Sequence, residues 1–91
     1  MSTLTAPDIV RDVKEYVLTR FLPGEDPAAL TEATPLIASG ILDSLATLDL
    51  VGFLEERYAI ELDAADTDAS RIGTLADIAR LVAGKRARGG A

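Results

Sequence analysis

The chain has 91 residues, which is the length of one small domain, and 48% of them are hydrophobic. It contains no cysteine and no histidine, which excludes disulfides, thiol nucleophiles, cysteine-based zinc sites and a Ser–His–Asp triad. The net charge is −6 at pH 7, and eight acids against one base lie between residues 43 and 68; such a segment repels nucleic acid and attracts basic protein surfaces.

The N-terminal residues 1–12 lack the basic start and the long apolar run of a signal peptide. No apolar stretch approaches the roughly 20 residues that a membrane-spanning helix needs. The absence of cysteine fits a reducing compartment. We therefore expect a soluble, cytoplasmic protein that binds neither membranes nor nucleic acid.

The first helix is predicted to begin near Thr5 and to end before Pro23-Gly24. Thr5 is a good N-cap, Pro7 suits the first turn, and Asp8 occupies the capping-box position. Apolar and aromatic residues then recur at helical spacing: Ile9, Val13, Tyr16, Val17 and Phe21. Proline followed by glycine stops a helix.

A long connection follows over residues 23–43, polar in its first half and apolar in its second. The apolar residues are Leu36, Ile37, Ile41 and Leu42. Because about twenty structureless residues would be unusual in a compact domain, we expect the apolar half to pack onto the helices, with one short helical turn around Leu36. Gly40 is expected to allow a tight bend.

The second helix is predicted to run from Ser44 to Tyr58. Projected at about 100° per residue, its core face comprises Thr47, Leu50, Val51, Leu54 and Tyr58. The opposite face comprises Leu45, Asp49, Gly52 and Glu56, with Leu48 at the border. Leu45 is therefore an apolar residue on an otherwise polar face.

Residues 59–73 are acidic and lack helical periodicity, so we expect a loop with one short helix around 66–71. The last helix is predicted to start at the cap Thr74, with Asp77 completing a capping box, and to end at Gly84. Its apolar stripe comprises Leu75, Ile78, Ala79 and Val82. Residues 85–91 are predicted to form a basic, disordered tail.

These elements predict a single all-α domain over residues 1–91, with an ordered core from about residue 5 to residue 84. The predicted architecture is a bundle of three main helices plus one short helix, with a long first loop. No internal repeat and no strand pattern stands out in the sequence.

Ser44 stands where the long loop ends and the second helix begins. Either Ser44 or Asp43 could cap that helix. Because Asp43 alone suffices as a cap, and because Ser44 precedes the outward-facing Leu45, Ser44 is also a candidate for chemistry at a contact surface.

The segment TPLIASGILDSLATLDLVGFLEERYAIEL resembles the acyl and peptidyl carrier proteins of fatty-acid, polyketide and nonribosomal peptide synthesis. The triplet Asp43-Ser44-Leu45 matches their D-S-L motif. The likeness extends to the helix order, the long first loop and the acidic second helix, over roughly residues 5–84. The resemblance therefore implies an acyl-carrier-protein-like bundle.

The resemblance also implies that Ser44 is the attachment point for 4′-phosphopantetheine, which a phosphopantetheinyl transferase would move from coenzyme A onto the hydroxyl. The thiol of this group would hold an acyl or aminoacyl cargo as a thioester. A chain without cysteine or histidine could then take part in acyl chemistry without being an enzyme. Asp43 is assigned to recognition by the transferase, and no bound metal is expected.

The acidic face of the second helix is interpreted as a docking surface for successive enzymes. Its leucines would be apolar anchors, and its acids would pair with Arg or Lys of the partners. The docking residues are Leu45, Leu48, Asp49, Gly52, Glu55 and Glu56. Gly52 replaces a bulkier residue common in the family, and either lets a partner approach closely or is neutral. The expected partners are a loading enzyme (an adenylating ligase or an acyltransferase) and downstream synthases, transferases or tailoring enzymes, each visiting a monomeric carrier.

The segment TPLIASGILDSL looks more like freestanding carriers of secondary metabolism, including aminoacyl and D-alanyl carriers, than like the fatty-acid carrier. It lacks the G-G-x-S typical of peptidyl carriers in large synthetases, and acyl and aminoacyl cargo both stay open.

Two other readings compete with the carrier. An unmodified helical interaction domain would leave the Ser-Leu pair unexplained. An enzyme is disfavoured because the adjacent Glu55 and Glu56 point in different directions on a helix. A calcium loop is disfavoured because the acids Asp63, Asp66 and Asp68 lack the glycine and glutamate of an EF-hand.

Overall fold

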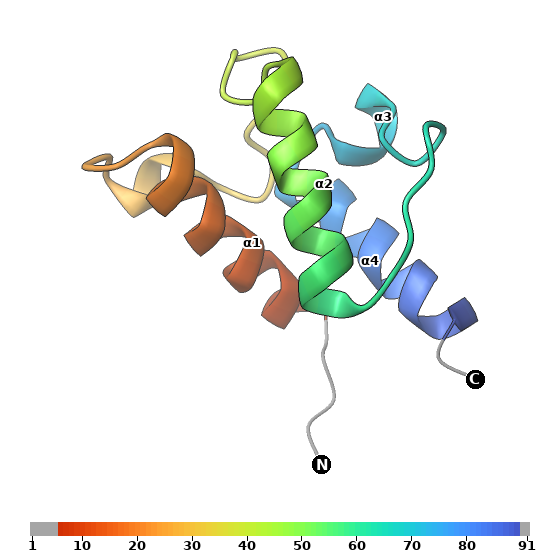
Figure 1. Cartoon of the computed structure of the whole chain (residues 1–91). Coiled ribbons are helices and arrows are strands. Elements are labelled where there is room, and N and C mark those ends of the chain that lie inside the picture. The colour runs from red at the N-terminus through yellow and green to blue at the C-terminus, as the bar shows by residue number, and fades with distance from the viewer. Residues whose placement is uncertain (1–5, 90–91) are drawn as a thin grey trace.

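The computed structural model describes residues 6–89, and the side chains of all of these except 6, 69 and 87–89. Every regular element within this range is helical (Figure 1). The elements are α1 (Ala6–Phe21), the 3-10 helix η1 (Pro27–Ala29), α2 (Ser44–Tyr58), α3 (Ala69–Ile72) and α4 (Leu75–Gly89). The predicted all-α class is confirmed, and α2 has the predicted bounds. None of the helices within residues 6–89 combines the length and the apolarity that crossing a membrane requires.

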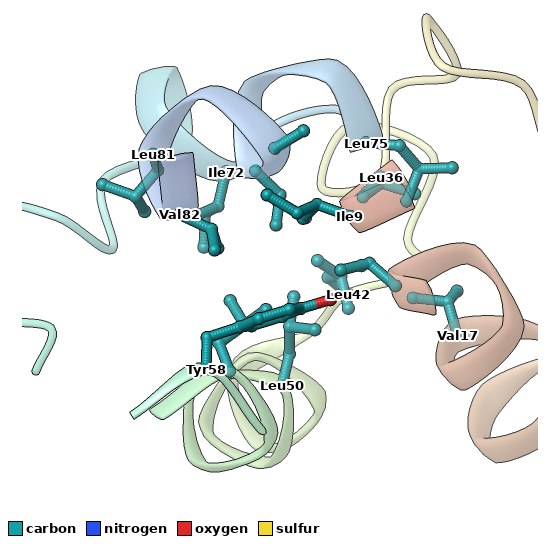
Figure 2. Packing of buried hydrophobic residues seen from close by; sticks show 14 of the residues in the cluster. Ile9, Val17, Leu36, Leu42, Leu50, Tyr58, Ile72, Leu75, Leu81 and Val82 are labelled. Atoms are coloured by element: carbon teal, nitrogen blue, oxygen red, sulfur yellow. The ribbon is translucent and has the colours of Figure 1, made fainter. Parts of the chain in front are cut away.

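Helix α4 is central to the packing, because α1, α2 and α3 all contact it. Figure 2 shows Leu50 and Tyr58 of α2 facing Ile9 of α1 and Val82 of α4, all of them buried. The buried apolar residues form one cluster: Ile9, Val13, Val17, Leu30, Leu36, Leu42, Ala46, Leu50, Leu54, Tyr58, Ile60, Ile72, Leu75, Ile78, Ala79, Leu81 and Val82. The apolar stripe predicted for the last helix is buried, whereas those predicted for the first two also include half-buried residues such as Tyr16 and Val51.

Helix α1 ends where the sequence predicts. The backbone N–H of Leu22 still bonds to the carbonyls of Val17 and Leu18 at 3.2 Å. Gly24 then adopts a φ of +88°, a left-handed conformation that favours glycine and turns the chain out of the helix. The predicted cap Thr5 lies outside the described residues.

The long loop packs onto the core, as predicted, but its short helix lies elsewhere. Asp26 caps η1 by accepting the Ala28 N–H at 3.0 Å. Around Leu36 the chain forms hydrogen-bonded turns instead of the predicted helical turn. Leu36 is buried, and its N–H donates to the Gly73 carbonyl at 2.7 Å, so a long-range contact fixes this stretch. Gly40 has a φ of +85°, which confirms the predicted bend.

Helix α3 begins three residues later than the predicted short helix, because its cap is Asp68, whose carboxylate accepts the Ser70 N–H at 3.1 Å. The predicted cap of α4 is confirmed, since Thr74 Oγ1 accepts the Asp77 N–H at 3.1 Å.

The predicted end of the last helix at Gly84 is wrong, because α4 continues to Gly89. Lys85 Nζ lies 2.6 Å from Asp66 Oδ2, and Arg86 donates to the Tyr58 carbonyl at 3.0 Å. These contacts with the 59–68 loop and with α2 offset the roughly 1 kcal/mol that a glycine costs inside a helix. Residues 85–89 therefore belong to the folded unit and not to a disordered tail, while 90–91 lie outside the described residues.

The Asp66–Lys85 pair predicts a pH dependence of stability. Hydrogen bonds from Lys85 and from the Asp63 loop hold the pKa of Asp66 below its ordinary value of 3.8. The unfolded chain then binds more protons in acid, so this stabilisation is complete above about pH 5 and is lost as the pH falls through the folded-state pKa. We expect Asp66→Asn to show a shallower loss of stability than wild type between about pH 5 and pH 2, measured by urea unfolding. Equal slopes for the two proteins would contradict this assignment.

Candidate functional site

The first turn of α2 is capped by Asp43 and not by Ser44. Asp43 Oδ1 accepts the Ala46 N–H at 2.8 Å, and the Asp43 carbonyl accepts the Thr47 N–H at 2.9 Å. Ser44 is the first residue of the helix and is exposed. Within the described part of the chain its hydroxyl has no hydrogen-bond partner. The capping requirement is thus met without Ser44, whose Oγ is left for contact with other molecules.

Buried neighbours on both sides fix the position of Ser44. Leu42 is buried before it, and its N–H donates to the Leu36 carbonyl at 2.9 Å. Ala46 is buried after it. The exposed Asp43-Ser44-Leu45 triplet therefore stands on two packed residues and presents the serine from a rigid base.

The start of α2 favours a bound anion through its free N–H groups, while the nearby Asp43 carboxylate repels it. The N–H groups of Ser44 and Leu45 make no backbone hydrogen bond within the described residues, and a helix N-terminus carries partial positive charge. A phosphate ester on Ser44 would lie beside these donors. The Asp43 carboxylate opposes it, although its Oδ1 is occupied by the Ala46 N–H.

The outward face of α2 carries exposed leucines next to the serine. Leu45 is 74% exposed and Leu48 is 68% exposed. Asp49, Gly52 and Glu56 are exposed on the same face. The helical projection from the sequence is confirmed here, and the border position Leu48 faces solvent. The two exposed leucines make this face a candidate contact surface.

The three acids assigned to docking have different surroundings. Asp49 forms an ion pair with Arg20 of α1 at 3.4 Å, with about half of each side chain exposed. Glu55 is half-buried, and its carboxylate accepts the Leu62 N–H at 2.9 Å. Glu56 has no hydrogen bond or ion pair with any described residue. Glu55 therefore also binds the loop after α2, and its predicted role in docking stays a prediction.

All four aromatic residues of the chain form one run between α1 and α2. The rings of Tyr16 and Phe53 stack with centroids 4.1 Å apart and planes 13° apart. Phe21 meets Tyr16 edge-on, and Tyr58 meets Phe53 edge-on. Beside this run an open groove of about 540 Å³ lies on the surface, with Gly52 in its lining. The α1 side of this groove could not be predicted from the sequence, because the pairing of Tyr16 with Phe53 requires the tertiary structure.

Tyr58 and Arg57 link α2 to α1 through the Asp12 carboxylate. The buried hydroxyl donates to Asp12 at 3.3 Å, and Arg57 pairs with the same carboxylate at 3.2 Å. Burial, followed by the charge of Asp12, raises the pKa of Tyr58 to about 12. This phenol stays protonated near neutral pH and does not serve as a base there.

The carboxylates of Asp63, Asp66 and Asp68, in and at the end of the 59–68 loop, all bind other groups of the chain. Asp63 Oδ1 accepts the Asp66 N–H at 2.9 Å. Asp66 pairs with Lys85, and Asp68 caps α3. Each of these carboxylates thus has a partner from the chain itself.

No protein-family model matches this chain, and a search of curated proteins finds no significant match. The carrier interpretation accordingly depends on the D-S-L segment and on the geometry at the start of α2.

Proposed function

We propose that the protein is a carrier that bears 4′-phosphopantetheine on Ser44 and presents acyl or aminoacyl intermediates to partner enzymes. The main support is that Ser44 is exposed at the first position of α2 while Asp43 alone provides the cap. The Ser44 hydroxyl is therefore not used by the cap and is available for an ester bond. The helix order and the long loop also fit an acyl-carrier-like bundle.

The residues at the start of α2 have separate roles in this proposal. Ser44 Oγ would lose its proton and form the phosphodiester bond, displacing adenosine 3′,5′-bisphosphate from coenzyme A. The N–H groups of Ser44 and Leu45 would be available to the phosphate, and the partial charge of the helix end would favour its negative charge. Asp43 holds the turn and is recognised by the transferase. When bound, the group supplies a terminal thiol that holds the cargo as a thioester.

The exposed face of α2 serves docking in this proposal. Leu45 and Leu48 give small apolar anchors next to the attachment point, and Glu56 offers a charge that has no partner among the described residues. Such a surface suits weak binding that exchanges quickly, as a carrier needs when it visits several enzymes. The partners are a phosphopantetheinyl transferase, a loading ligase or acyltransferase, and downstream synthases and tailoring enzymes, and the carrier acts as a cytoplasmic monomer.

The experiment is incubation of the purified protein with coenzyme A and a broad-specificity phosphopantetheinyl transferase, followed by intact mass spectrometry. We expect a mass gain of one phosphopantetheine per chain. A control carrier is treated in parallel. An unmodified protein beside a fully converted control would contradict the proposal and favour an unmodified helical interaction domain.

A further inference from the structure

Gly52 lies in the middle of α2, at a position where the fold of the chain does not require a glycine. A Cβ built at this position meets no atom within 4 Å. A glycine inside a helix costs about 1 kcal/mol relative to alanine. Packing within the chain thus gives no reason for a glycine at this position.

The surroundings of Gly52 form the groove between α1 and α2. Leu48 and Glu56 lie one turn before and one turn after Gly52 on the same face, and both line the groove. Tyr16 and Phe53, the stacked pair, also line it. The groove therefore combines an apolar wall, aromatic rings and an open strip of backbone.

The charges along the groove are paired except for one. Arg20 is held by Asp49 at 3.4 Å, and Arg57 is held by Asp12 at 3.2 Å. Glu56 has no ion pair or hydrogen bond within the described residues. A visiting cation would therefore complete the charge pairing of the groove.

We propose that this groove receives an arginine side chain of the transferase that modifies Ser44. This inference rests on the proposed function. The aliphatic stem lies over Gly52 against Leu48, and the planar guanidinium lies near the Tyr16–Phe53 pair and binds Glu56. Arginine fits because its guanidinium both stacks on aromatic rings and pairs with carboxylates.

The position of the groove is compatible with this partner. Gly52 is eight residues after Ser44, which corresponds to about 12 Å along a helix. A protein interface of ordinary size covers about 800 Å² on each side, so an interface centred on Ser44 is large enough to reach Gly52.

The test compares Gly52→Leu with Gly84→Leu, because Gly84 is also exposed inside a helix, with open space at its Cβ, but does not line the groove. The assay is phosphopantetheinylation by the transferase at varied carrier concentration. We expect kcat/KM to fall about tenfold for Gly52→Leu, which corresponds to about 1.4 kcal/mol and is the scale of a substantial interface contact, and to stay near the wild-type value for Gly84→Leu. The melting temperatures of both variants should equal or exceed that of wild type, since leucine favours helices more than glycine does.

A second variant, Glu56→Gln, tests the charge without filling the groove. We expect a several-fold lower kcat/KM and a weaker dependence on salt than in wild type. If the wild type is modified but Gly52→Leu and Glu56→Gln both react at the wild-type rate, the groove proposal is wrong while the carrier proposal stands. If the wild type itself is not modified, the carrier proposal fails first. Should Gly52→Leu lower the melting temperature, the Glu56→Gln result decides.

Discussion

Replacing Ser44 by alanine is expected to abolish phosphopantetheinylation completely while leaving the fold intact. The substitution removes the only oxygen that the proposal assigns to the ester bond. Asp43 keeps its bond to the Ala46 N–H, so the free energy of unfolding should change by no more than about 0.5 kcal/mol. Intact mass spectrometry measures the modification, and thermal unfolding followed by circular dichroism measures the stability.

Ser39→Ala is the matched control for this substitution. Ser39 is also an exposed serine, five residues earlier, and its hydroxyl donates only a 3.4 Å bond to the Leu36 carbonyl. We expect Ser39→Ala to be modified like wild type. Modification of Ser44→Ala at the wild-type level, or its loss in Ser39→Ala alone, would place the reaction elsewhere on the chain.

Leu54→Ala is expected to destabilise the protein by about 2–5 kcal/mol, because it leaves a cavity in the core. Leu54 is fully buried between α2 and the rest of the cluster. A loss of this size is a large share of the roughly 5–15 kcal/mol by which small domains are stable. Urea unfolding measures the effect.

Leu48→Ala makes the same chemical change on the same helix and serves as the control. Leu48 is 68% exposed, so its truncation should change the free energy of unfolding by no more than about 0.5 kcal/mol. Modification of Leu48→Ala by the transferase should nevertheless slow, since the proposal makes Leu48 a docking anchor. A large loss of stability in Leu48→Ala, or none in Leu54→Ala, would contradict the assignment of the buried and exposed faces of α2.

Local signals sufficed to predict the elements that short-range physics determines. The bounds of α2 follow from a strong cap at Asp43 and from a regular apolar period that ends at Tyr58. The bend at Gly40 follows from the conformational freedom of glycine. The exposed position of Ser44 follows from the start of α2 and from the bend before it, because the loop ends and the helix begins at Ser44.

The errors arose where distant residues decide the structure. The end of α4 was placed at Gly84 because glycine commonly ends helices, but Lys85 and Arg86 find partners in the 59–68 loop and at the end of α2. The contact of Glu55 with the Leu62 N–H was also not predicted, because it depends on how the chain turns after α2. The Arg20–Asp49 pair joins two helices, and no pattern within either helix predicts it.

Only part of the candidate site could be predicted from the sequence, because the rest depends on contacts between distant residues. The D-S-L triplet and the outward Leu45 are readable from the sequence. That Asp43 performs the capping, which leaves Ser44 Oγ unengaged, became clear only from the geometry. The groove beside Gly52 depends on the stacking of Tyr16 on Phe53, so only the tertiary structure shows that it lies along the exposed face of α2.

The most direct test is peptide-level mass spectrometry of the wild-type protein after reaction with coenzyme A and the transferase. The proposed attachment predicts one phosphopantetheine, carried by the peptide that contains Ser44 and located on that residue by fragmentation. A protein that stays unmodified while a control carrier is converted, or a group found on Ser39, Thr47 or Ser70, would contradict it.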